Sequence, residues 1–194
     1  MNTSRPGTSE RGEWHREKQK VALASVLAAL LLVTLKLVVG VATRSLGILS
    51  EAAHSGLDLV AATVTLISVR VADKPADFSH PFGHGKVEHL SGFIEAALLL
   101  VTCAWIVVEA ARRLFFQEVH VEPSLWAFAV MFISLTLDTF RSRALFRVAR
   151  KYNSQALEAD ALHFLTDVYS SSVVILGLVT DKILMVLVKI LAQM

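Results

Sequence analysis

The chain has 194 residues, of which 54% are hydrophobic, and its formal net charge at neutral pH is +2. The apolar residues lie in long blocks that a soluble core of this size does not need. This excludes a soluble enzyme, a disordered chain and a disulfide-stapled secreted module. The small net charge gives no indication of a nucleic-acid partner, and the single cysteine excludes an intrachain disulfide or a Cys-rich zinc cage.

Residues 1–20 are polar and are predicted to form a flexible cytoplasmic tail, and residues 21–194 form the predicted transmembrane domain. This domain contains five apolar blocks, each of about 17–24 residues, which is long enough for a helix to cross a bilayer. The five predicted complete spans cover residues 21–43, 48–71, 91–111, 124–140 and 161–179. A last apolar stretch, residues 183–194, has only 12 residues and includes Lys189, so we expect a short or truncated sixth span.

The basic residues predict the orientation of these spans. With the N-terminus inside, the tail and the loops at 70–88 and 141–154 hold 13 Lys and Arg residues, whereas the outer loops hold three. Such a bias places the N-terminus in the cytoplasm. No cleavable signal peptide is evident, and we expect a multi-pass protein of a bacterial inner membrane.

Several ionisable residues lie inside the predicted spans, where each costs free energy. We expect Lys36 to reach the outer interface with its long side chain. Asp138 is expected to pair with Arg141, three residues further along the chain. Glu95 lies deeper, and its sequence context indicates no role.

The second and fifth spans share the pattern acid-Ala-x-His-x-x-x-Asp, at residues 51–58 and 160–167. Residues four apart lie on one face of a helix, so each His points the same way as its Asp. Two such faces, opposed in a bundle, supply two imidazoles and two carboxylates, a ligand set that suits tetrahedral Zn²⁺. The predicted metal ligands are His54, Asp58, His163 and Asp167.

Other interpretations of this pattern stay open. Each His–Asp pair could be a structural hydrogen bond within its helix, or the two histidines could be axial ligands of a haem, which leaves the two aspartates unexplained. The additional acids, Glu51 and Asp160, are predicted to attract cations in the outer and the cytoplasmic vestibule respectively. Asp160 could instead be a helix-start acid favoured by the helix dipole.

The predicted cytoplasmic loop between the second and third spans is shaped by prolines and glycines. Within it, Asp77, His80 and His84 could converge on a metal ion that keeps one position open to water. The alternative is a solvated loop whose histidines cap the next helix. The remaining histidines, His15, His89 and His120, are interpreted as surface residues.

These motifs together resemble the cation diffusion facilitator family of divalent-metal/proton antiporters. The resemblance covers roughly residues 16–180 and rests on both His-x-x-x-Asp pairs, the loop at 75–88 and the run at 154–172. It implies a six-helix bundle with both termini in the cytoplasm, a following cytoplasmic metal-binding domain, and homodimers. By the same resemblance, the two pairs are the transport site and the loop residues are a second metal site.

The resemblance further implies a secondary transporter, not an enzyme, that has no organic cofactor and exports Zn²⁺ across the lipid bilayer in exchange for protons. The His-Asp/His-Asp set is similar to that of zinc and cadmium transporters, while the loop looks like an iron/zinc branch, so Cd²⁺, Fe²⁺ and Co²⁺ are further candidates. After residue 179 the sequence departs from the family, and the cytoplasmic domain is expected to be absent. The alternative function is therefore a truncated, non-transporting membrane partner of a full-length homologue.

Overall fold

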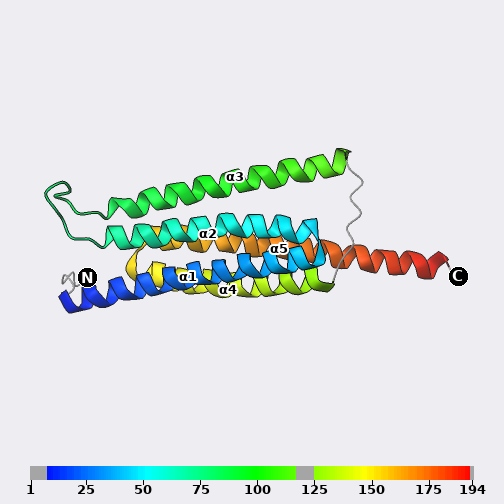
Figure 1. The fold of residues 1–194 in the computed structure, drawn as a ribbon, viewed down its shortest axis with the longest axis horizontal. Coiled ribbons are helices and arrows are strands. Elements are labelled where there is room, and N and C mark those ends of the chain that lie inside the picture. Colours follow the sequence, from blue (N-terminus) through cyan, green and yellow to red (C-terminus); the bar gives the residue numbers. More distant parts are fainter. Residues whose placement is uncertain (1–7, 117–124, 193–194) are drawn as a thin grey trace.

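The computed structural model describes residues 8–116 and 125–192, and over these ranges the regular structure is helical throughout. This confirms the prediction of an all-α protein. Figure 1 shows the five helices lying roughly along one common axis. They are α1 (Thr8–Thr43), α2 (Leu46–Ala72), α3 (Lys86–Phe116), α4 (Leu125–Tyr152) and α5 (Gln155–Ala192).

Four of the helices pack closely, and α3 lies beside them (Figure 1). α1 contacts α2 and α4, α5 contacts α2 and α4, and α3 contacts α2 and α5. The centre of the packing is built largely from small side chains, because Ala61, Ala62, Ala156 and Ala161 are all fully buried. Small residues let membrane helices approach closely, so they bring α2 and α5 within reach of each other.

Two tight turns make antiparallel hairpins of α1 with α2 and of α4 with α5. Arg44 and Asn153 take positive φ values of 53° and 50° at these turns, a left-handed conformation that ends the preceding helix. Ser45 caps α2, because its hydroxyl accepts a hydrogen bond from the Ile48 backbone N–H at 3.4 Å. These turns fix where along the bundle axis α2 and α5 carry their His–Asp pairs.

Three helices are long and apolar enough to cross a membrane within the part of the chain that the structure describes. They are α1 over Gly12–Thr43, α2 over Leu46–Ala72 and α3 over Lys86–Val108. The complete spans expected at residues 124–140 and 161–179 stay predictions.

The expected separate sixth segment at residues 183–194 is wrong over its described part. α5 continues without a break from Gln155 to Ala192, and residues 193–194 lie outside the described residues. The polar pair Asp181–Lys182 lowers the local hydropathy but does not end the helix. Neither Pro nor Gly occurs after residue 177, so no residue in this stretch breaks the backbone pattern.

The first helix begins earlier than its apolar residues indicate. Residues 8–20, expected to lie in a flexible tail, are the first turns of α1, whereas residues 1–7 lie outside the described residues. Trp14 contacts Tyr152 with ring centroids 5.4 Å apart, which holds the start of α1 against the end of α4. The division into a tail and a transmembrane domain stays a prediction.

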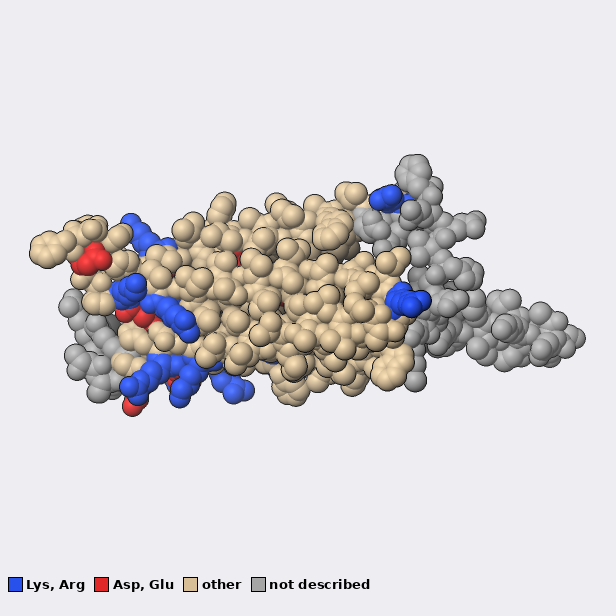
Figure 2. All heavy atoms as spheres, viewed as in Figure 1, with Lys and Arg blue, Asp and Glu red and all other residues tan. Residues whose placement is uncertain are grey.

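A buried ionic cluster joins the helices at one end of the bundle. Lys18 of α1 lies 2.6 Å from Asp73, the residue that ends α2, and 3.1 Å from Glu88 of α3. Ser154, directly before α5, donates a hydrogen bond of 2.6 Å to Glu88. We call this the loop end of the bundle, since it also carries residues 73–85. On the face shown in Figure 2, Lys and Arg gather mainly at this end, as the predicted cytoplasmic side requires.

The α1–α2 hairpin generates a prediction at Gly40. A Cβ atom there would lie 3.0 Å from Leu49 Cγ and 3.2 Å from the Leu49 backbone nitrogen. Gly40→Ala should therefore destabilise the protein by about 1–3 kcal/mol through overpacking, seen as a lower thermal midpoint in detergent. Gly12→Ala is the matched control, because no atom lies within 4 Å of its added Cβ. Equal thermal midpoints for the two variants would contradict the close approach of Gly40 to Leu49.

Candidate metal centre

The two predicted His–Asp pairs lie on helices that contact each other in the bundle. α2 carries His54 and Asp58, and α5 carries His163 and Asp167. In each helix the four-residue spacing puts the imidazole and the carboxylate one turn apart on the same face.

The four side chains converge across the contact between α2 and α5. His163 Nε2 lies 3.2 Å from Asp58 Oδ1, and His54 Nε2 lies 3.6 Å from Asp167 Oδ1. Within the helices, the His54–Asp58 and His163–Asp167 distances are 4.0 Å and 3.7 Å. The donor atoms of His54, Asp58 and Asp167 lie within 4.8 Å of one another. The expected proximity is confirmed, and metal binding by these residues stays a prediction.

Burial makes this cluster costly unless its members have partners. Asp58 and His163 are 7% and 2% exposed, and both face the interior of the bundle. Asp58 shares a hydrogen bond with His163 of the opposite helix at 3.2 Å, and Asp167 lies 3.6 Å from His54 of the opposite helix, within ion-pair distance. The result is a compact cluster of two imidazoles and two carboxylates.

Lys36 does not reach the outer interface, so the expectation that it would do so is wrong. Its side chain is buried, and the ammonium group donates hydrogen bonds of 2.7 Å to Ser55 and 3.3 Å to Glu51. The reason is the polar face of α2, where Glu51 and Ser55 lie one turn apart and offer two acceptors. Glu51 is exposed and pairs with Lys36, and its expected attraction of cations in the outer vestibule stays a prediction.

Asp160 is fully buried, which contradicts its expected place in an open vestibule. Its carboxylate accepts a hydrogen bond of 3.2 Å from Ser25, which in turn accepts one of 3.1 Å from Arg141. Arg141 also donates to Asp138 at 3.0 Å, as the sequence predicted, and its guanidinium lies 3.6 Å from the ring centroid of Phe164. This network connects α1, α4 and α5.

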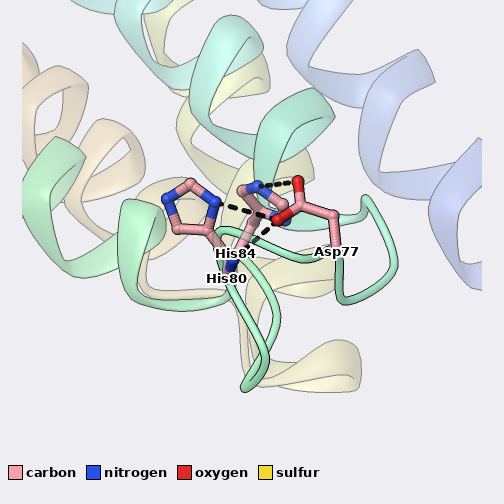
Figure 3. Close-up of side chains that lie close together, drawn as sticks. All are labelled: Asp77, His80 and His84. Atoms are coloured by element: carbon pink, nitrogen blue, oxygen red, sulfur yellow. Dashed lines mark hydrogen bonds and ion pairs between the residues drawn. The ribbon is translucent and has the colours of Figure 1, made fainter.

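The loop between α2 and α3 brings together the second set of predicted ligands. Figure 3 shows Asp77, His80 and His84 turned toward one another, with the donor atoms of all three within 4.8 Å. His80 Nδ1 lies 3.2 Å from Asp77 Oδ1, and His84 Nε2 lies 3.5 Å from Asp77 Oδ2. The backbone N–H of His80 donates to Asp77 at 2.6 Å, and this bond holds the pKa of that carboxyl below its ordinary value.

Two of the histidines interpreted as plain surface residues have specific partners. His15 Nδ1 lies 2.6 Å from Asp73 Oδ1, and His89 Nδ1 lies 2.7 Å from Gln155 Oε1. Both contacts link helices that are distant in sequence, so no local pattern could have indicated them. His120 lies outside the described residues.

The described residues combine apolar helices long enough to cross a membrane with paired imidazoles and carboxylates between them. Residues 22–193 match the family model of the cation efflux transmembrane domain. The chain belongs to this family, which confirms the resemblance drawn from the motifs. The expected departure from the family after residue 179 is wrong, because the match continues to residue 193. Membership makes it a multi-pass integral membrane protein among transporters, not enzymes.

Relatives occur in several prokaryotes. An uncharacterized transporter of Methanocaldococcus jannaschii is 34% identical over 86% of the chain and 59% of its own length. The manganese efflux system protein MneP of Bacillus subtilis is 31% identical over 87% of the chain and 55% of its own length. The cation-efflux pump FieF of Shewanella oneidensis is 30% identical, with 82% and 53% covered. The chain thus spans little more than half the length of these relatives.

The loop geometry predicts how metal binding there depends on pH. Because its pKa is lowered, Asp77 stays ionised in mild acid and remains available to a cation there. An imidazole ordinarily titrates near pH 6.5, and each bound proton must leave before the metal binds. Zn²⁺ affinity should therefore be flat above about pH 7.5 and fall up to about 100-fold per pH unit below about pH 6.

This prediction can be checked by Zn²⁺ titration of Asp58→Asn, which removes a carboxylate from the other cluster. Asp77→Asn added to that variant is the control that should abolish the loop signal. A loss of affinity that begins only near pH 4 would show that the carboxyl, and not the imidazoles, controls the loop.

The buried guanidinium generates a prediction about stability. Arg141→Met removes the only hydrogen-bonded cation of Asp138 among the described residues, and should cost about 3–5 kcal/mol because a buried charge loses its partner. Asp138→Asn in the same chain should restore part of the thermal midpoint. No restoration would show that Arg141 acts mainly through Ser25 and Phe164.

Proposed function

We propose that the chain exports Zn²⁺ from the cytoplasm of a prokaryotic cell in exchange for protons. His54, Asp58, His163 and Asp167 are the proposed transport ligands. The observation that carries this proposal is the convergence of their donor groups between α2 and α5, at distances of 3.2 to 4.0 Å.

The chemistry of the four ligands supports Zn²⁺ as the substrate. Two imidazoles and two carboxylates form a borderline set of the kind Zn²⁺ binds in a tetrahedral site. Two carboxylates also balance the charge of a divalent ion, which lowers the cost of bringing it into the bundle. Cd²⁺, Fe²⁺ and Co²⁺ are further candidates, and the relative MneP is named for manganese.

Proton exchange follows from the same ligands. A metal ion needs a neutral imidazole and an ionised carboxylate, so metal and protons compete for His54, His163 and the two aspartates. An imidazole ordinarily titrates near pH 6.5, which suits a site that must change its protonation at physiological pH. Protons that arrive from outside displace the metal outward, and cytoplasmic metal displaces the protons inward. α2 and α5 are the second helices of two different hairpins, and a site between two such units suits alternating access.

The loop cluster is proposed as a second, exposed Zn²⁺ site at the cytoplasmic end. Asp77 and His80 are exposed and His84 is partly buried, so the cluster can exchange ligands freely with water. Three protein ligands leave a position open to water, as in many Zn²⁺ sites. The homodimer implied by the family resemblance is likewise a proposal, and cross-linking in native membranes would test it.

Transport is tested in proteoliposomes that contain the full chain and a zinc-sensitive dye. Loss of a residue that only supports a metal ligand typically costs roughly 10–100-fold in metal affinity or activity. Asp58→Asn and His163→Gln change the proposed ligands themselves, so each should lower Zn²⁺ flux by more than that. Glu158→Gln is the matched control, because this acid is exposed in the first turn of α5. An imposed pH gradient should drive Zn²⁺ toward the acidic side.

Two outcomes would contradict the proposal. Zn²⁺ flux that does not respond to the pH gradient would exclude antiport, and unchanged flux in both site variants would exclude these ligands. Parallel measurements with Cd²⁺, Fe²⁺, Co²⁺ and Mn²⁺ would rank the substrates.

A further inference from the structure

The imidazole of His163 has a hydrogen bond on only one of its two nitrogens within the described residues. Its Nε2 shares a hydrogen bond of 3.2 Å with Asp58 Oδ1, whereas its Nδ1 is buried and has no hydrogen-bond partner there. In metal sites, the second ring nitrogen of a histidine ligand normally donates to an acceptor that fixes the orientation of the ring. If Nε2 binds the metal, as proposed, it gives up the hydrogen bond to Asp58, so another neighbour must orient the ring.

Phe164, the next residue along α5, is in contact with this imidazole. The two ring centroids lie 5.4 Å apart and the ring planes meet at 83°, an edge-to-face arrangement. Aromatic pairs favour this geometry over a parallel sandwich, so the direction of one ring restricts that of the other. Phe164 is 0% exposed, and a close-packed interior leaves its ring little room to change rotamer. The orientation of His163 therefore depends on what holds the ring of Phe164.

Arg141 of α4 lies over the face of the Phe164 ring. Its Cζ is 3.6 Å from the ring centroid and the side chain is buried, so water screens the attraction between cation and ring very little. The guanidinium is fixed in turn, because two of its nitrogens donate hydrogen bonds of 3.0 Å to Asp138 and 3.1 Å to Ser25. A planar group tied at two nitrogens keeps the stacked ring in one place. A continuous series of contacts thus leads from α4 to the imidazole.

We propose that Arg141 is a positioning residue for His163: it holds the ring of Phe164, and that ring sets the direction in which the imidazole points. The inference rests on the proposed transport function only in taking His163 as a metal ligand. The competing explanation is that Arg141 serves only to balance the charge of Asp138 and to fill the core. The two explanations differ in what the imidazole does once stability has been restored by a second substitution.

Nuclear magnetic resonance of the full chain in detergent, labelled at histidine, tests the positioning without any metal. The His163 signal is assigned by its loss in His163→Gln, and the neighbouring aromatic ring shifts this signal in a way that depends on ring orientation. Arg141→Met should move or broaden it. Leu145→Ala is the matched control, because it removes another fully buried side chain of α4 from the same core and should leave the signal in place. An unmoved His163 signal in Arg141→Met overturns the proposal.

A double variant separates positioning from stability and covers the case in which Arg141→Met does not fold. Asp138→Asn removes the carboxylate that Arg141→Met leaves without its cation, so the double variant should regain part of the thermal midpoint. Its His163 signal should stay displaced, since the Phe164 ring still lacks the guanidinium. Return of the signal to its original position in the double variant would show that Arg141 acts through charge balance alone.

Zn²⁺ affinity completes the test in an Asp77→Asn background, which removes a carboxylate from the loop cluster. Arg141→Met and Phe164→Leu should each lower the affinity by roughly 10–100-fold, as loss of a residue that orients a ligand does. Because both act through one contact, the two changes together should cost no more than the larger single one, whereas losses that multiply contradict action through Phe164. If the background chain binds no Zn²⁺ while its His163 signal still responds to Arg141→Met, the transport function falls and the positioning stands.

Discussion

A charged group inside an apolar bundle is tolerated only where it meets an opposite charge or a hydrogen-bond donor, and the whole arrangement depends on this constraint. Lipid tails are as apolar as the helices, so burial of leucine and valine does not by itself hold membrane helices together. Here buried cationic side chains connect the helices. Lys18 joins α1 to the end of α2 and to α3, Lys36 joins α1 to α2, and Arg141 joins α4 to α1.

The same constraint explains why the four side chains of the candidate metal centre lie together. Each carboxylate of the centre is within reach of an imidazole on the opposite helix, so the four groups are one another's partners. A cation bound there, as proposed, would replace these contacts with bonds to the same four groups. The balance between bound and free states then depends on the difference between two sets of polar contacts.

A contact is easier to predict from the sequence when its two residues lie close together along the chain. The His–Asp faces of α2 and α5 follow from a spacing of four residues, and the loop cluster follows from eight consecutive positions. Lys36 and Asp160 could not be placed in this way, because their partners lie on other helices and one sequence does not say which helices touch. His15 and His89 were missed for the same reason.

The continuous fifth helix shows a different limit. A drop in hydropathy at Asp181 and Lys182 was interpreted as the end of a span, but charge alone does not stop a helix. Helices end where a backbone signal such as Pro, Gly or a capping side chain is present. Arg44 and Asn153 mark such ends through their positive φ values, and no Pro or Gly occurs after residue 177.

The two tight turns have a consequence for the centre as a whole. Because α1 with α2 and α4 with α5 are each closed by a turn, each hairpin carries half of the ligands, one imidazole and one carboxylate. A half-centre of two donors binds a cation far more weakly than the complete set of four. The contact between the two hairpins is therefore also the line along which the proposed ligand set divides, so a rotation of one hairpin against the other would separate its two halves.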